Sequence, residues 1–426
     1  MPFFFLCIVL LFSSTTAIAG GGKPLPEPLS LEYALALAVK SGHPDLLKAD
    51  ARIAGAEADQ LGVEANNGLE VGVVGGLKLI EPSEVAGDQN NEDSYLKLNA
   101  RKRLYDFGRT QAGREAAQAG LQGSRHRLID SRQRRYLEVM RRYFDVLLAD
   151  LRHTRDNEAL AIAFIAMDKI RDKVELKQKS DFDLAKLERD YQIVRRRLHI
   201  SSNRQRGTRA ALALALNRPG ELSSELKTPN LKRWNRPVPE LDLLNQRLKR
   251  GNPLLKAMRA ELERDRKLVA KAKASNNPVL SGSIGAGVYQ REMGGYHPMT
   301  AELTLEIPLF TGGRSDAEAA KARSAMMMKS AELKALELEL LQRVTDLWLE
   351  LQGLKVKLEE LQAAADYREL KLDRNRALYE MEVKADLGDS MVDISAQNLD
   401  EAEVKFRKAL VWAEIEALTG SLLRGK

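Results

Sequence analysis

The stretch "RLYDFGRTQAG" at residues 103–113 joins two structural patterns without a loop between them. The residues before it alternate between apolar and polar, as in a β-strand, and those after it have a helical pattern. About two hundred residues later, "PLFTGGRSDAEA" at 308–319 makes the same change. We interpret both stretches as strand-to-helix junctions, built around Gly108 and Arg109 in the first and Gly313 and Arg314 in the second.

The residue types at the junctions predict how each strand gives way to a helix. Gly108 allows the backbone to change direction, because glycine adopts conformations closed to other residues. We expect Thr110 to cap the first helix and Ser315 the second, where Glu318 would complete a capping box. The aromatic Tyr105 and Phe107 suit a membrane interface.

The junctions belong to an internal repeat that covers the chain. Arg109 pairs with Arg314 at an offset of 314 − 109 = 205, and Pro44 pairs with Pro253 at 253 − 44 = 209. Around these anchors "SGHPDLLKA" resembles "RGNPLLKA", and "EANNGLEVG" resembles "ASNNPVLSG". Each copy contains two short helices, two strands, a junction and two long helices. We place the copies at residues 20–237 and 238–426.

The strands are expected at about 68–80, 94–105, 278–290 and 299–309. Apolar residues occupy one face of each, and in the second strand Lys97, Asn99, Arg101 and Arg103 lie opposite. Each run is long enough for the ~9 to 11 residues of a tilted membrane strand. A half-buried soluble sheet has the same alternation, but a packed core would have to pair all these charges. Four strands cannot close a barrel, so spanning strands imply an oligomer.

The remaining sequence predicts very long helices at about 110–177, 181–216, 314–382 and 386–418. In the third, leucines and Val344 step by four and three residues from Leu340 to Leu361, which is a coiled-coil seam. A helix of ~65 residues is roughly 100 Å long, beyond an ordinary globular domain. The chain turns back near 176–183 and 384–390.

Composition limits the alternatives. The first nineteen residues, "MPFFFLCIVLLFSSTTAIA", fit a secretory signal peptide, although no Lys or Arg precedes the apolar run. The only cysteine, Cys7, lies inside that run, so we expect a mature chain without disulfides. The net charge of +7 is mild for 426 residues, and the clustered arginines at 132–142 lie among acidic residues. They favour a solvated helix face over a nucleic-acid surface.

The sequence resembles the outer-membrane efflux protein family, the TolC-type channels. The resemblance lies in residues 104–109 ("LYDFGR"), their counterpart 308–314 ("PLFTGGR"), the duplicated layout and the endings "LNRPG" (216–220) and "LTG" (418–420). It implies an α+β membrane protein, a homotrimer in which four strands per chain form a twelve-stranded barrel in the outer membrane. Antiparallel coiled-coil helices would continue the barrel as a periplasmic tunnel. It also implies an inner-membrane transporter and a periplasmic adaptor as partners.

The resemblance assigns roles to three groups of residues. Ser180, Asp183 and Tyr379 match the adaptor-docking tips, although Lys177 and Glu382 stand about where glycine is common. We expect the second group to line an acidic ring at the channel entrance, the alternative being acids that complement a helix dipole: Asp386, Asp389 and Asp393. The third group is expected in the barrel lumen, with rim salt bridges as the alternative: Lys97, Arg101, Arg103, Glu302 and Glu306.

No catalytic, cofactor or metal motif accompanies these features. The five histidines lack metal-ligand spacing, and no phosphate loop or nucleophile elbow is visible. We therefore expect a passive exit duct for efflux or type I secretion and no enzyme. The alternative is a periplasmic coiled-coil scaffold or adaptor without its own pore. No pattern distinguishes drugs, metal ions and polypeptides as cargo.

Overall fold

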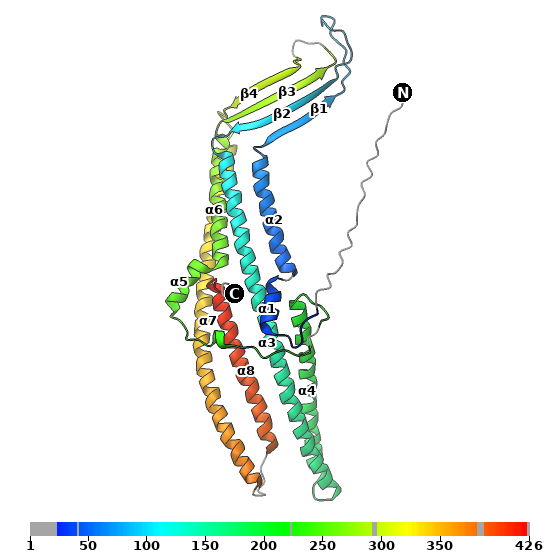
Figure 1. Ribbon diagram of the computed structural model, residues 1–426, viewed down its shortest axis with the longest axis vertical. Coiled ribbons are helices and arrows are strands. Elements are labelled where there is room, and N and C mark those ends of the chain that lie inside the picture. The colour runs from blue at the N-terminus through cyan, green and yellow to red at the C-terminus, as the bar shows by residue number, and fades with distance from the viewer. Residues whose placement is uncertain (1–23, 41, 222–223, 292–295, 381–386, 424–426) are drawn as a thin grey trace, which may run out of the picture.

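The computed structural model describes residues 24–40, 42–221, 224–291, 296–380 and 387–423. The molecule is elongated, with a β-sheet at one end and the turns between long helices at the other (Figure 1). The segment expected to be a signal peptide, 1–19, lies outside the described residues. Among the helices that are described, none is both long enough and apolar enough to cross a membrane.

The same order of elements occurs twice along the chain. The first half contains α1 (Leu31–Lys40), α2 (Pro44–Ala65), β1 (Leu69–Gly76), β2 (Tyr95–Tyr105), α3 (Arg109–Glu175) and α4 (Asp181–Ala215). The second half contains η1 (Lys232–Trp234), α5 (Leu241–Gly251), α6 (Pro253–Lys273), η2 (Ala274–Asn276), β3 (Val279–Tyr289), β4 (Met299–Glu306), α7 (Arg314–Glu380) and α8 (Leu387–Leu418). Long helices and four strands agree with the expected fold class.

Proline opens the same helix in each half. Pro44 and Pro253 lie in the first turns of α2 and α6, where the missing N–H costs no hydrogen bond. In α6, the Asn252 side chain caps the helix by accepting from the Leu255 N–H at 2.9 Å. The short helices α1 and α5 lie beside the middle of the long helices (Figure 1).

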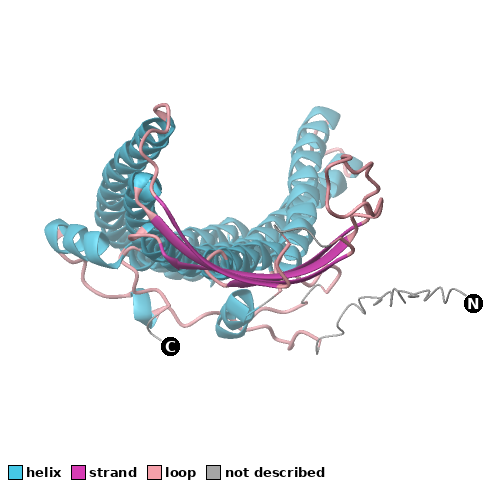
Figure 2. Ribbon diagram, turned by 90° about the horizontal axis from the view of Figure 1, so that it is seen from above, coloured by secondary structure: helices cyan, strands magenta, loops and turns pink. Residues whose placement is uncertain are grey.

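The four strands form one antiparallel sheet in the order β1-β2-β3-β4. The register aligns Glu70, Arg101, Ser283 and Glu302 in one row across all four strands. β1 is shorter than the 68–80 expected, since it ends at Gly76 and beyond it only Leu79 forms an isolated bridge, with Glu92. Seen from above, the sheet is curved and the long helices follow an arc on its concave side (Figure 2). Such a sheet has two free edges, β1 and β4.

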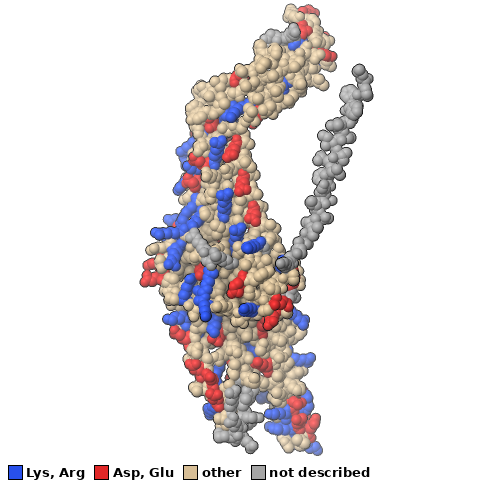
Figure 3. Space-filling view, in the orientation of Figure 1, with Lys and Arg blue, Asp and Glu red and all other residues tan. Residues whose placement is uncertain are grey.

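One face of the sheet is apolar and uncovered. Leu69 of β1, Ile284 of β3 and Leu303 of β4 are 64%, 61% and 67% exposed. In the space-filling view the sheet end carries few charged side chains, whereas acidic and basic residues cover the helices (Figure 3). A chain that left this face in water would lose the free energy of burying it. The sheet therefore needs an apolar environment on this side.

The hydrophobic core lies at the middle of the molecule, where α1, α3, α5, α7 and α8 meet. Phe144 of α3 stacks on Phe406 of α8 with ring centroids 4.5 Å apart. The Tyr143 hydroxyl donates to the carbonyl oxygens of Leu29 and Lys227 at 2.8 and 2.6 Å, which fixes both connecting segments to α3. This core holds the two halves together and sets the direction of the long helices.

Candidate pore surface and helical tips

The opposite face of the sheet carries the charged residues predicted to line a lumen. By alternation in the register, Lys97, Arg101 and Arg103 of β2 share this face with Glu302 and Glu306 of β4. The Lys97 ammonium lies 4.4 and 5.1 Å from the ring centroids of Tyr95 and Tyr289, so the aromatic rings stabilise its charge. The apolar and charged residues thus separate onto two faces, as a pore wall requires.

The first junction is capped by a residue other than the one expected. α3 begins at Arg109 with Gly108 at the N-cap, φ +99°. The carboxylate of Asp106 accepts from the Thr110 N–H at 3.1 and 2.9 Å and also from the Thr110 hydroxyl. The prediction that Thr110 caps the helix was therefore wrong. Thr110 lies inside the first turn, because the positive φ of Phe107 and Gly108 starts the helix earlier.

The second junction reproduces this geometry at the same offset. The Arg109 and Ala112 N–H groups bond to the carbonyls of Asp106 and Gly108, and 205 residues later Arg314 and Ala317 bond to Thr311 and Gly313. Gly312 and Gly313 both have positive φ. The expected Ser315–Glu318 capping box is also incorrect, because α7 begins at Arg314 and the Ser315 hydroxyl contacts the Thr311 hydroxyl at 3.0 Å.

Arg109 and Arg314, the arginines of the two junctions, line one polar pocket of about 380 Å³ at the foot of the sheet. The pocket also contains Arg101 and Arg103 from the charged face. Arg103 lies 3.8 Å from Asp106, measured from Nη1 to Oδ2. With Glu306, which also lines the pocket, the structure thus brings five of the predicted lumen and junction residues together.

The first helical tip combines two features of helix ends. At the end of α3, Lys177 has φ +57°, and the N–H groups of Lys177 and Gln178 bond back to Val174 and Lys173. This Schellman arrangement favours glycine at the position of Lys177. At the start of α4, Ser180 and Asp183 form a reciprocal capping box. The hydrogen bond from the Ser180 hydroxyl, followed by that from its backbone N–H, lowers the pKa of Asp183.

The second tip is described only in part. Tyr379 belongs to α7 and Asp389 to α8, whereas Asp386 lies outside the described residues. The carboxylate of Asp393 accepts from the Lys371 ammonium of α7 at 2.9 Å. The acidic ring therefore remains a prediction, with one of its three residues ion-paired to the neighbouring helix.

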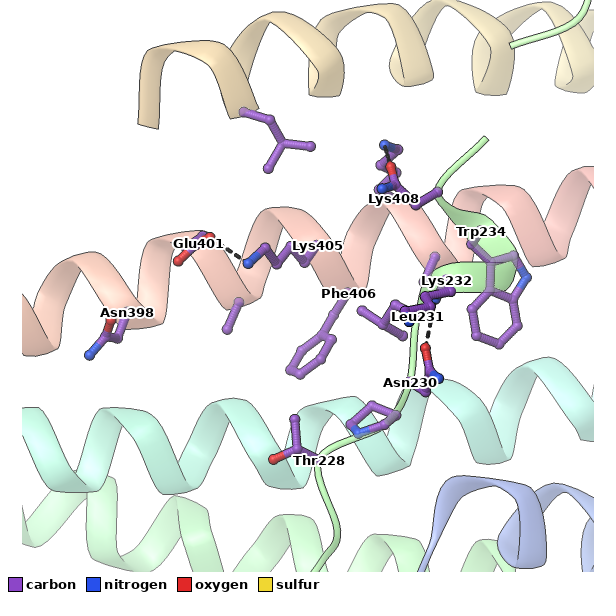
Figure 4. Close-up of a pocket in the computed structure, with 15 residues that line it drawn as sticks. Thr228, Asn230, Leu231, Lys232, Trp234, Asn398, Glu401, Lys405, Phe406 and Lys408 are labelled. Atoms are coloured by element: carbon purple, nitrogen blue, oxygen red, sulfur yellow. Dashed lines mark hydrogen bonds and ion pairs between the residues drawn. The ribbon is translucent and has the colours of Figure 1, made fainter. Parts of the chain in front are cut away.

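A pocket of about 580 Å³ lies at the middle of the molecule, between the segment 228–235 and α8 (Figure 4). Phe406 and Leu231 contribute apolar surface, and Lys408 donates to the Asn235 side chain at 3.0 Å at the rim. Burial lowers the pKa of Lys408. None of the residues predicted to be functional lines this pocket.

Sequence reasoning missed two residues at the sheet. Asp106 was quoted as part of the junction, but its capping role depends on backbone conformation. Lys102 lies on the apolar face, because it pairs with Leu69 and Gly282 in the register. Side chains alternate along a strand, so Lys102 shares the face of Leu98 and Ala100, and its position could have been predicted from the sequence. Its long side chain can carry the ammonium away from the apolar surface.

Comparisons with known proteins agree with this geometry. The family model "Outer membrane efflux protein" matches residues 244–421. Among solved structures, CusC has a TM-score of 0.75 with 16% sequence identity, covering 92% of each chain. The outer membrane channel CmeC of Campylobacter jejuni has a TM-score of 0.76 with 13% identity, covering 92% of this chain and 86% of CmeC. The outer membrane protein VceC of Vibrio cholerae has a TM-score of 0.71 with 17% identity, covering 92% and 96%. A search of curated proteins found no match.

The chain has the fold of these solved channel structures over 92% of its length. In sequence, the similarity to the outer membrane efflux proteins covers residues 244–421, most of the second half of the chain.

Proposed function

We propose that three copies of this chain form a channel that acts as the passive exit duct of a tripartite efflux or type I secretion system. The observation that carries the proposal is the sheet with two free edges, one charged face and one uncovered apolar face. In this proposal the sheet lies in the outer membrane, where lipid supplies the apolar environment that this face needs.

Closure by further copies follows from strand direction. Because neighbouring strands are antiparallel in the order β1-β2-β3-β4, β1 and β4 run in opposite directions. The β4 edge of one copy can therefore pair antiparallel with the β1 edge of the next. Three copies contribute 3 × 4 = 12 strands, and the resulting barrel has no free edge in lipid. A soluble scaffold or adaptor without a pore would leave both edges and the apolar face unexplained.

The helices supply the periplasmic part of the duct. α3 and α7 have 67 residues each, which corresponds to about 100 Å at 1.5 Å per residue. We assign docking of a periplasmic adaptor, and through it an inner-membrane pump, to the tips with Ser180, Asp183 and Tyr379. We also assign the acidic ring at the entrance to Asp386, Asp389 and Asp393, of which Asp389 and Asp393 belong to α8.

A cross-linking experiment tests the closure directly. Val71 and Ala301 lie in one row of the sheet, separated by β2 and β3. At ~4.8 Å per strand they are about 14 Å apart, too far for a disulfide within one chain. We would pair a cysteine at Val71 with one at Ala301, Leu303 or Leu305 in turn, since the stagger between copies selects the partner. The sole natural cysteine, Cys7, lies in the expected signal peptide.

The expected result is a ladder ending at three chains on a non-reducing gel for at least one pair, and none for the single-cysteine controls. The purified oligomer should conduct ions in a planar bilayer. A chain that stays monomeric without detergent and conducts nothing would instead be the scaffold.

A further inference from the structure

Both halves of the chain place an arginine in the same polar pocket. Arg109 is the first residue of α3 and Arg314 the first residue of α7, and both line the pocket of about 380 Å³ at the foot of the sheet. The Asn277 side chain donates to the Phe107 carbonyl at 2.8 Å, which ties the first junction to the start of β3. The position of the pocket is therefore fixed by contacts between the two halves.

Positive charge is in excess in this pocket. Four arginines and two glutamates, Glu70 and Glu306, line it, and Asp106 lies 3.8 Å from Arg103 as a third carboxylate, a balance of 4 − 3 = +1. Glu70 lies directly opposite Arg101 in the register and offsets its charge. Within the described part of the chain, the guanidinium groups of Arg109 and Arg314 form no ion pair with a carboxylate. Their hydrogen-bond donors are available to a ligand.

Two further features favour an anion here. The long helices α3 and α7 both start at the pocket. The carboxylate of Asp106 already caps α3, so the N-terminus of α7 is the one that adds partial positive charge. The hydroxyls of Ser281 and Thr311 also line it. Guanidinium groups bind carboxylate and phosphate through paired hydrogen bonds.

We propose that this pocket is an anion-binding site at the boundary between barrel and tunnel, for solutes carrying phosphate or carboxylate groups. The proposal rests on the proposed channel function, in which three copies bring 3 × 1 = 3 excess positive charges to one level of the duct. Anions dwell there transiently, because conduction requires binding weak enough for release. The acidic residues predicted at the entrance lie at the other end of the helices, so the two ends of the tunnel select opposite charges.

Block of single-channel current in planar bilayers tests the site. Tripolyphosphate is the phosphate probe, citrate is the carboxylate probe, and both are applied at low salt to the wild-type channel. We expect both to interrupt the current, with a block that weakens as salt rises through screening. The variant R109Q/R314Q should need an at least about tenfold higher concentration of either anion for the same block, since charge-assisted hydrogen bonds are lost. K97Q, which removes a lumen charge outside the pocket, is the matched control and should change block less than twofold.

Each outcome decides between defined alternatives. Conducting wild-type channels without block would overturn the anion site and leave the channel function intact, whereas absence of conductance would overturn the channel function itself. Equal block in wild type and R109Q/R314Q would also reject the site. If that variant fails to assemble, R101Q provides the test, because Arg101 lies on β2 away from the helix starts. The conservative R109K/R314K should retain part of the block.

Discussion

Both carboxylate oxygens of Asp106 accept hydrogen bonds from the backbone N–H of Thr110, at 3.1 and 2.9 Å. Asp106 is only 6% exposed, and Arg103 lies beside it. The carboxylate accepts from an N–H group in the first turn of a 67-residue helix, which has no partner within the helix, and its negative charge complements the helix dipole. In the second half the equivalent residue is Thr311, which offers only a hydroxyl. The two junctions thus share a backbone geometry but differ in the strength of their caps.

Replacing Asp106 with alanine should weaken the first junction. Loss of the capping carboxylate is expected to cost about 0.5–2 kcal/mol, the range for removing a side chain that caps a helix N-terminus. Hydrogen exchange of the amides in the first turn of α3 should accelerate, by about tenfold for each 1.4 kcal/mol lost. T311A is the matched control in α7 and should change exchange less. Unaltered exchange in D106A would show that the carboxylate does not hold the turn.

The long helices and the faces of the sheet could be predicted from the sequence because both depend on hydrophobic period. α4 was expected at about 181–216 and is found at Asp181–Ala215. The caps were assigned wrongly because a serine or threonine near the start of a helical pattern looks like an N-cap. The positive φ of Phe107 moves the start of the helix. A positive φ at a residue other than glycine is uncommon, and no local sequence pattern predicts it here.

The charged pocket could not be predicted because it depends on contacts between the halves. Arg109 and Arg314 are 205 residues apart, and each resembles an ordinary first-turn residue in the sequence. The register places Arg101 beside Glu70, and pairing between strands is not visible in either strand alone. Only the folded chain shows that these residues share one space.

Replacing Lys177 with glycine should stabilise the first tip. Lys177 has φ +57°, which costs a residue with a side chain roughly 1 kcal/mol relative to glycine. The N–H of Gln178 bonds to the Lys173 carbonyl at 2.7 Å. Hydrogen exchange of this amide should therefore slow by about threefold to fivefold as the helix end becomes more stable. K173G, in the last turn of α3, provides the contrast and should speed exchange. A faster rate in K177G would contradict the steric argument.

The first tip should loosen in acid. The pKa of Asp183 is lowered from its ordinary value of 3.8 by hydrogen bonds from Ser180, so the folded state binds this proton less readily than the unfolded state. The contribution to stability is present above the ordinary value and is lost as the pH falls through the lowered pKa. Exchange of the α4 first-turn amides, compared at matched intrinsic rates, should rise below this range. S180A should show a smaller dependence, and an identical pH profile would refute the linkage.

Replacing Tyr143 with phenylalanine should destabilise the middle of the molecule. The hydroxyl of this fully buried residue joins Leu29 and Lys227, and its removal is expected to cost about 1–2 kcal/mol. The thermal midpoint of the oligomer should fall, and proteolysis near residues 24–30 should accelerate. Y33F removes a hydroxyl from a tyrosine that is 42% exposed and should leave both unchanged.

The ion pair between Lys371 and Asp393 predicts that replacing one partner or the other shifts ion selectivity in opposite directions. At 2.9 Å the ammonium offsets the Asp393 charge, so removing Lys371 should add net negative charge to the second tip. K371Q should raise the cation-to-anion permeability ratio, and D393K should lower it, as should charge reversal at Asp389. Reversal potentials across a salt gradient measure the ratio. K357Q, which disrupts the exposed pair of Lys357 with Glu360 along α7, is the control. If K371Q and D393K shift the potential in the same direction, or neither shifts it, Asp393 does not belong to an acidic ring, and its role is the structural one of joining α8 to α7.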